Sequence, residues 1–194
     1  MLKHLYWGRY ALVGSAVLVL VCSAPRIASA SPITIANPGF ETGDTTGWTF
    51  AAASQGSDFS VAADDPHSGV FAADFGATSI GFYDSISQNL TTTAGQSALV
   101  TFWLANDATP ANDFQVLWNG SVVIDILNSN PFPYRLFSFI APTPSSSSTL
   151  MFRGYQIPGF FHLDDVSAQT APEPASLVLL GSGLALLVRR KLRA

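Results

Sequence analysis

Between residues 31 and 170, apolar side chains occur in short runs separated by clusters of Gly, Pro, Ser, Thr and Asn. The runs are rich in Val, Ile, Phe, Thr and Tyr, and none keeps the 3.6-residue period of an amphipathic helix. This pattern is typical of β-strands joined by turns. The predicted strands lie within residues 60–63, 70–75, 79–90, 97–105, 113–120, 121–127, 134–141, 148–155 and 160–168.

The clearest local signal is a hairpin in the middle of this region. Phe114, Val116 and Trp118 alternate with other side chains, and Asn119-Gly120 then separates them from a second apolar run. An Asn-Gly pair between two such runs predicts a two-residue β-turn. Many short strands at this spacing predict an all-β domain over residues 31–170, an antiparallel β-sandwich or barrel.

The N-terminal segment has a different pattern. Residues 1–30 begin with basic side chains, continue with an apolar run over 11–22, and end in the small residues Ala28 and Ala30. This three-part pattern predicts a secretory signal peptide, helical in its apolar part, that signal peptidase removes just before Ser31. The only cysteine lies inside this leader, so the mature chain is expected to contain no disulfide.

The C-terminal segment, residues 171–194, holds the other long apolar run. Residues 175–188 would span about 21 Å as a helix, which is short of the roughly 30 Å hydrocarbon core of a bilayer. The run is followed at once by a basic cluster, the pattern that stops a membrane helix with its C-terminus inside. We therefore expect a C-terminal transmembrane helix. The basic cluster is Arg189, Arg190 and Lys191.

A short motif precedes this apolar run. Pro172-Glu173-Pro174, the apolar run and the basic cluster, in this order, resemble the PEP-CTERM sorting signal of Gram-negative bacteria. The resemblance implies an inner-membrane intermediate that an exosortase, a membrane-embedded cysteine peptidase, recognises and processes. The two prolines also favour an extended backbone, as a protease site requires. The alternative is a permanent C-terminal membrane anchor.

The charge of the chain is unevenly distributed. Of the nine Lys and Arg residues, only Arg135 and Arg153 lie between residues 31 and 170, against twelve acidic residues, so this region has a formal charge of −10. Such a domain cannot neutralise phosphates, which argues against nucleic acid as a partner. An acidic surface suits solvent exposure or the binding of hard cations such as calcium.

A second resemblance concerns the start of the predicted sandwich. The segment from Asn37 to Glu41, followed by Gly47-Trp48, resembles the first motif of galactose-binding-like jelly rolls, the fold of many carbohydrate-binding modules. The resemblance implies a structural Ca²⁺ held by Glu41 with Asp164 or Asp165, together with carbonyls near residues 65–69. The alternative is that Glu41 is a solvated turn residue and that the two aspartates end a strand.

Carbohydrate binding would require exposed aromatic side chains next to polar groups. Tyr155 is the preferred candidate because the neighbouring Gly and Pro residues predict an exposed loop, and Trp118 is a second candidate that shares the face of the predicted core. The resemblance to jelly-roll domains implies that Trp48 and Trp103 lie in the core. The other aromatic candidates are Tyr134, Phe160 and Phe161.

Catalytic motifs are missing from the sequence between residues 31 and 170. This region has two histidines, His67 and His162, of which His162 is expected on the sheet surface. The adjacent pairs Asp64-Asp65 and Asp164-Asp165 are expected to point to opposite faces of a strand, which does not suit paired carboxylate catalysis. We therefore expect a non-catalytic protein.

Together these patterns predict an exported protein, sorted through the inner membrane to the cell surface or the extracellular matrix. Its sandwich would bind polysaccharide, in keeping with the association of such tails with exopolysaccharide and biofilm production. The alternative is a purely structural surface or matrix protein that binds no small ligand and stays anchored in the inner membrane.

Overall fold

The computed structural model describes residues 30–171, which form eleven β-strands and no helix. The all-β prediction is therefore confirmed for this part of the chain. Ala28, both terminal helices and the sorting motif predicted from the sequence lie outside the described residues. The strands are β1 (Pro32–Ile33), β2 (Thr49–Ala51), β3 (Ser60–Ala62), β4 (Ala72–Phe75), β5 (Asp84–Thr91), β6 (Gln96–Asn106), β7 (Asn112–Trp118), β8 (Ser121–Leu127), β9 (Phe132–Thr143), β10 (Ser147–Gln156) and β11 (Phe161–Thr170).

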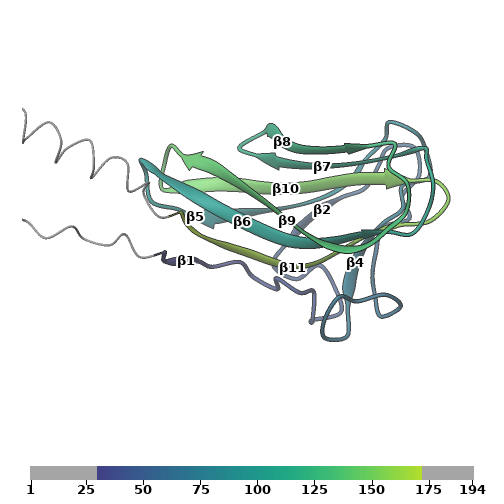
Figure 1. The fold of residues 1–194 in the computed structure, drawn as a ribbon, viewed down its shortest axis with the longest axis horizontal. Helices are drawn as coiled ribbons and strands as arrows, with labels where there is room; N and C mark the ends of the chain where they lie inside the picture. Colours follow the sequence, from purple (N-terminus) through teal and green to yellow (C-terminus); the bar gives the residue numbers. More distant parts are fainter. Residues whose placement is uncertain (1–29, 172–194) are drawn as a thin grey trace, which may run out of the picture.

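The strands form two antiparallel sheets that pack face to face (Figure 1). One sheet has the order β3-β4-β11-β6-β9, with β1 pairing along the end of β11. The other sheet has the order β2-β5-β10-β7-β8. In each sheet neighbours in space are mostly distant in sequence, as expected for a jelly-roll sandwich.

The predicted hairpin is confirmed. Asn119 and Gly120 connect β7 to β8 with φ values of 50° and 81°, the left-handed conformations that a type I′ turn requires. One predicted strand is shorter than expected. Residues 79–83 form a turn with a positive φ at Gly81, so β5 begins only at Asp84.

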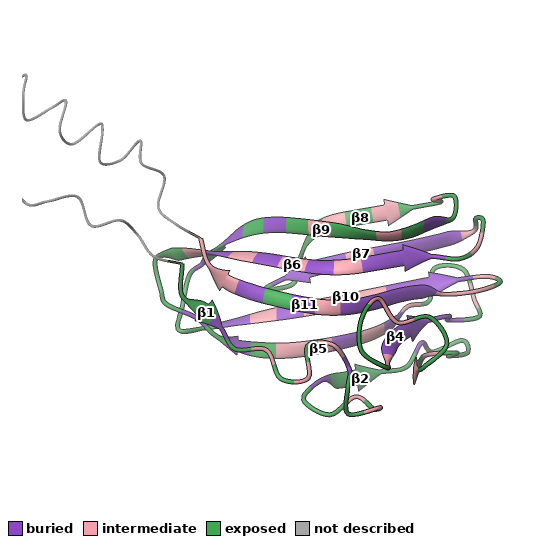
Figure 2. Ribbon diagram, turned by 60° about the horizontal axis from the view of Figure 1, so that its bottom comes forward, coloured by how far each residue is buried: buried purple, intermediate pink, exposed green. Residues whose placement is uncertain are grey.

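The core lies between the two sheets and consists largely of aromatic rings. Phe152 on β10 has no exposed surface and contacts the rings of Trp48, Phe102 and Phe114. Figure 2 shows that the central strands β7, β10 and β11 are largely buried, whereas the edge strands β8 and β9 are mostly exposed. The prediction that Trp48 belongs to the core is confirmed.

The two ends of the described chain meet at one end of the sandwich. Ser31 and Thr170 exchange hydrogen bonds, and β1 pairs with the last residues of β11. The connections β6–β7, β8–β9 and β10–β11 lie at the opposite end, which we call the loop end (Figure 1). Over residues 30–171 the structure contains no helix long and apolar enough to cross a bilayer.

The alternation of buried and exposed positions can be tested with two leucines. Leu150 on β10 is fully buried, whereas Leu136 on β9 is 57% exposed. We expect Leu150→Ala to lower the free energy of unfolding by about 3–5 kcal/mol through the cavity it leaves. The matched change Leu136→Ala should alter it by less than about 0.5 kcal/mol. Urea unfolding of the full chain in mild detergent, followed by tryptophan fluorescence, measures both; equal losses would contradict the sandwich.

Candidate functional site

The three carboxylates predicted as cation ligands lie together beside Gly39. A Cβ atom on Gly39 would lie 3.4 Å from Oδ1 of both Asp164 and Asp165. It would also lie 3.8 Å from Cγ of Glu41. The structure thus brings the first motif and the closing strand together. We call Glu41, Asp164 and Asp165 the acidic cluster; its binding of a metal stays a prediction.

Asp164 is fully buried and accepts hydrogen bonds through both oxygens. Its Oδ2 accepts from the backbone N–H groups of His67 and Ser68, at 2.9 and 3.0 Å. Its Oδ1 accepts from the N–H of Asp165 at 2.7 Å. Burial raises the pKa of Asp164 above its ordinary value, although these backbone donors partly oppose the shift. The ionised group is therefore costly to bury unless positive charge is near.

Asp165 reaches the same loop as Asp164, contrary to the expectation that adjacent strand residues point to opposite faces. The pairing of β11 with β6 shifts between Asp164 and Ser167, and Asp165 has a φ of 48°. This bulge redirects the side chain. Its Oδ2 lies 2.7 Å from Nδ1 of His67, and its Oδ1 accepts from the Ser68 hydroxyl at 2.9 Å.

Glu41 holds the other half of this loop. Its Oε1 accepts from the backbone N–H groups of Val70 and Phe71, at 3.0 and 3.2 Å. The loop can approach the carboxylate because residue 69 is glycine. A Cβ atom at this position would clash sterically with Oε1 of Glu41. Glu41 is an exposed turn residue, as the alternative expects, and its carboxylate also holds this loop. We call residues 65–71 the anchored loop.

The donor set of the acidic cluster suits a hard cation. One ligand atom from each of His67, Asp164 and Asp165 lies within 4.8 Å of the others. Two carboxylates lie close to this one imidazole, so the group carries excess negative charge. Carboxylate and carbonyl oxygens are the ligands that Ca²⁺ prefers. Asp164 and Asp165 therefore fit such an ion, and a contribution from Glu41 stays a prediction.

The two aromatic residues predicted to bind ligand are not available at the surface. Tyr155 lies in β10 rather than in a loop and is only 5% exposed, because Tyr83, Ala53 and Ala77 pack against it. Trp118 is 3% exposed in the main core, where its Nε1 donates to a backbone carbonyl. The exposed-loop prediction for Tyr155 was wrong because the strand runs past Gly154.

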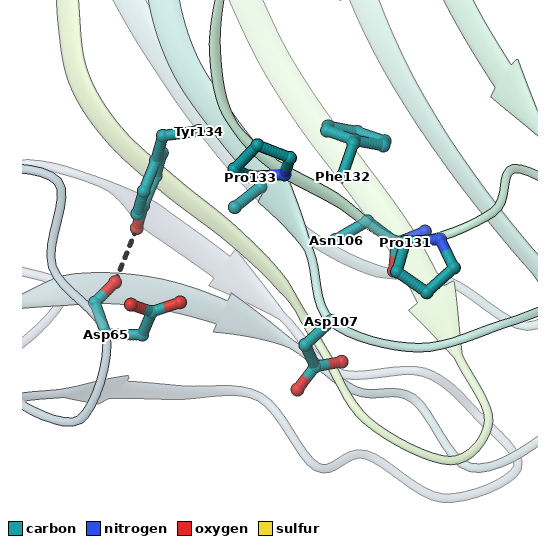
Figure 3. Close-up of a pocket in the computed structure, with 8 residues that line it drawn as sticks. Asp65, Asn106, Asp107, Pro131, Phe132, Pro133 and Tyr134 are labelled. Carbon is teal, nitrogen blue, oxygen red and sulfur yellow. Dashed lines mark hydrogen bonds between the residues drawn. The ribbon is translucent and has the colours of Figure 1, made fainter.

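An open pocket lies instead at the loop end (Figure 3). It has a volume of about 380 Å³ and two kinds of lining. Tyr134 and Phe132 supply aromatic surface, and the Tyr134 hydroxyl donates to the backbone carbonyl of Asp65 at 2.6 Å. The full lining is Asp65, Ala105, Asn106, Asp107, Pro131, Phe132, Pro133 and Tyr134.

Sequence reasoning identified Tyr134 as a candidate aromatic residue but missed the rest of this pocket. The sequence does contain a signal for this pocket. The polar residues Asn106 and Asp107 lie at the end of β6, and two prolines flank Phe132 at the start of β9, both at the loop end. Two other expectations near the pocket were wrong. Trp103 is not in the core; it lies half-buried on the outer face, with His67 stacked on it at 3.9 Å between ring centroids. His162 is not on the sheet surface, since it is 3% exposed.

Comparison with known proteins identifies the tail. Residues 170–193 match the PEP-CTERM protein-sorting motif, which confirms the resemblance noted in the sequence. The match spans Pro172, Glu173 and Pro174 as well as the basic cluster. This motif indicates export through the exosortase pathway of Gram-negative bacteria. No curated protein sequence matches the chain.

Solved structures share the β-sandwich. An adhesin domain of Lys-gingipain from Porphyromonas gingivalis is 12% identical with a TM-score of 0.55, over 73% of this chain and 99% of that one. TmCBM61, solved in complex with β-1,4-galactotriose, is 18% identical with a TM-score of 0.53, over 71% and 96%. The enzymatically active domain of bacteriophage CBA120 tailspike protein 4 is 13% identical with a TM-score of 0.53, but the match spans 72% of this chain and only 21% of that one. At these identities the likeness establishes the fold.

Two glycines test the role of the acidic cluster. Gly69 and Gly95 have φ values of 66° and 80°, so alanine is strained at both by roughly 1–2 kcal/mol. Only at Gly69 does the added Cβ meet a carboxylate; at Gly95 nothing lies within 4 Å. We expect Gly69→Ala to cost about 1–3 kcal/mol more than Gly95→Ala, because it displaces Glu41 from its donors. Urea unfolding compares them, and equal costs would show that Glu41 anchors nothing.

Proposed function

We propose that this chain is an exported, non-catalytic protein whose sandwich binds polysaccharide in the pocket at the loop end. The sorting motif supports delivery outside the inner membrane, and the fold is one that carbohydrate-binding modules share. The observation that carries the proposal is the pocket itself, because it combines exposed carboxylates with aromatic surface. Exopolysaccharide of the producing cell would be the natural partner for a protein sorted in this way.

The pocket has the size and chemistry that a sugar requires. Its volume of about 380 Å³ lies at the lower end of the range for small-ligand sites, which suits one or two sugar rings. The half-buried ring of Tyr134 offers an apolar face, and Asp65 and Asp107 offer exposed carboxylate acceptors for hydroxyl groups. With no lysine between residues 31 and 170, the domain favours neutral over anionic polysaccharide.

The position of the pocket agrees with display on a tail. The pocket residues come from the loop between β3 and β4, from the end of β6 and the residue after it, and from the start of β9. They lie at the loop end, whereas the chain leaves β11 at the opposite end (Figure 1). A sandwich attached through its C-terminus would therefore hold the pocket away from the attachment point. In this proposal the exosortase processes the tail, and signal peptidase removes residues 1–30.

A second function is favoured by the edge strands. Leu127 on β8 and Leu136 and Ile140 on β9 are 59%, 57% and 66% exposed. Among the strands of residues 30–171, β8 and β9 each pair along one edge only. Such edges can pair with other copies of the chain. In this alternative the protein is a structural component of the surface or matrix and binds no small ligand.

Polysaccharide binding is tested on the aromatic wall of the pocket. We expect Tyr134→Ala to weaken binding at least about tenfold, or roughly 1.4 kcal/mol, because it removes the more accessible ring. Tyr134→Phe should retain most of the affinity. The control Phe82→Ala removes an aromatic residue that is 38% exposed and does not line the pocket. A glycan array identifies the ligand, and polysaccharide pull-down with the full chain compares the variants. A blank array and pull-down would refute the proposal in favour of the structural alternative.

We also propose that the acidic cluster holds a structural Ca²⁺. A ligand that binds only the folded state stabilises it by about 2.7 kcal/mol at a hundredfold excess over its Kd. We expect millimolar Ca²⁺ to raise the Tm of the chelator-treated full chain by several degrees. Glu41→Gln should abolish the rise, whereas Asp58→Asn, at an exposed carboxylate, should leave it intact. No rise in Tm and no heat on titration would mean that backbone donors alone satisfy the cluster.

A further inference from the structure

Among the strands at the edges of the two sheets, β9 has the longest continuous edge. β1, β2 and β3 have two or three residues each, too few to offer a partner a long edge. β8 has seven residues, but its pairing with β7 shifts between Val116 and Leu117, and it carries Asp125. β9 has twelve residues and pairs with β6 in unbroken register from Arg135 to Thr143. Short strands, bulges and charges are the usual protections of a sheet edge, and β9 has the fewest of them.

The outer edge of β9 carries the backbone groups of Leu136, Ser138 and Ile140. Along a strand, the N–H and C=O groups of successive residues point to opposite sides. The carbonyl of Thr143 accepts the N–H of Gly95, which directly precedes β6, so the odd-numbered residues of β9 pair with β6. The even-numbered residues therefore direct their N–H and C=O groups away from the sheet. Over residues 30–171 no second strand pairs with β9.

The side chains along this edge are uncharged and accessible. Leu136 and Ile140 are 57% and 66% exposed, and Ser138 between them is also exposed (Figure 2). The adjacent strand β6 places Leu99 directly beside Ile140 on the same face. Residues 136–141 contain no charge and no proline. The edge can therefore accept another strand without burying an ionised group.

Electrostatics limit which strand can occupy this edge. Residues 31–170 have a formal charge of −10, so most approaches between two copies of the chain bring carboxylates together. The edge of β9 is different, because the one charged residue of the strand is Arg135. An identical strand adds no carboxylate to this edge, and the exposed Arg135 of each copy offsets part of the repulsion between the two acidic domains.

We propose that β9 pairs with β9 of a second copy of the chain, in antiparallel orientation, so that two sheets join across a two-fold axis. The register is centred on Ser138, which places Leu136 of one copy opposite Ile140 of the other as an apolar cross-strand pair. The even-numbered residues of the two strands then exchange about six backbone hydrogen bonds. Such an interface uses the same surface on both copies, so it closes as a dimer.

This pairing determines where the two pockets of a dimer lie. β9 begins at the loop end, where Phe132 and Tyr134 line the pocket. Because the paired strands are antiparallel, the two pockets lie at opposite ends of the dimer. A dimer that binds polysaccharide in both pockets would cross-link two polysaccharide chains. This cross-linking rests on the proposed function, whereas the dimer itself does not.

The dimer can be tested by sedimentation of the full chain in density-matched mild detergent, over a range of protein concentrations. We expect an equilibrium between monomer and dimer. Leu136→Lys should weaken the dimer at least about tenfold, because a lysine on a sheet edge opposes pairing with another strand. The matched change Leu127→Lys places the same charge at a 59% exposed position of β8 and should leave the dimer intact. Near-UV circular dichroism checks that both variants are folded.

A single cysteine tests the register. Cys22→Ser removes the only native cysteine, and Ser138→Cys then introduces one at the proposed two-fold axis. The two Cα atoms would lie about 5.5 Å apart, a distance that suits a disulfide. Oxidation with copper phenanthroline should therefore give a covalent dimer. The control Ser121→Cys, at an exposed position of β8 in the same background, should stay monomeric under these conditions.

Several results would overturn the proposal. They are a chain that is monomeric at every concentration, assemblies that grow beyond the dimer, and association that survives Leu136→Lys, which would then arise elsewhere in the chain. Loss of the dimer in Leu127→Lys, or a disulfide formed by Ser121→Cys and not by Ser138→Cys, would place the contact on β8 and would also overturn it. Glycan binding by the monomer would be unaffected in each case, because every pocket residue belongs to one copy.

Discussion

The attachment of the anchored loop to Glu41 and Asp164 is the interaction on which the loop end depends. This loop crosses from β3 to β4, and its backbone N–H groups have few partners apart from these two carboxylates. The attachment places His67 on Trp103 and Asp65 at the mouth of the pocket. It also brings buried negative charge into the sandwich, because Asp164 is fully enclosed. The proposed Ca²⁺ site follows from this arrangement, because the ion would neutralise the anchoring carboxylates.

The fold could be predicted from the sequence because strand signals are local. Alternation in residues 113–118 and the Asn119-Gly120 turn determine β7 and β8 without any long-range information. The same local signals give a wrong position for Tyr155. Gly154 predicts a loop there, but β10 continues through this glycine to Gln156. A glycine in a strand can equally mark close packing. A Cβ atom on Gly154 would lie 3.0 Å from Cδ2 of Phe114, so its absence leaves room for that ring.

Of the two candidate sites, only the acidic cluster could be predicted, because it belongs to a known motif. The resemblance to jelly rolls paired Glu41 with Asp164 and Asp165 across more than 120 residues, and the structure brings them together. Both aspartates reach one loop because β11 has a bulge, and the spacing of residues in the sequence does not predict this bulge. The pocket combines residues from three separate segments of the chain, none of which carries a recognisable motif. Such arrangements are set by strand order, which composition and periodicity do not determine.

The proposed function depends most on the sandwich working outside the inner membrane after its tail is processed. Every strand lies between Pro32 and Thr170, and Ser31 bonds to Thr170, so a chain trimmed at both ends would keep all eleven strands. The most direct test is the intact mass of the native protein, measured separately from the cell envelope and the medium. The account predicts a species that begins near Ser31 and ends near Pro172–Pro174, present outside the inner membrane. A mature species that retains residues 189–194 and occurs only in membranes would contradict it.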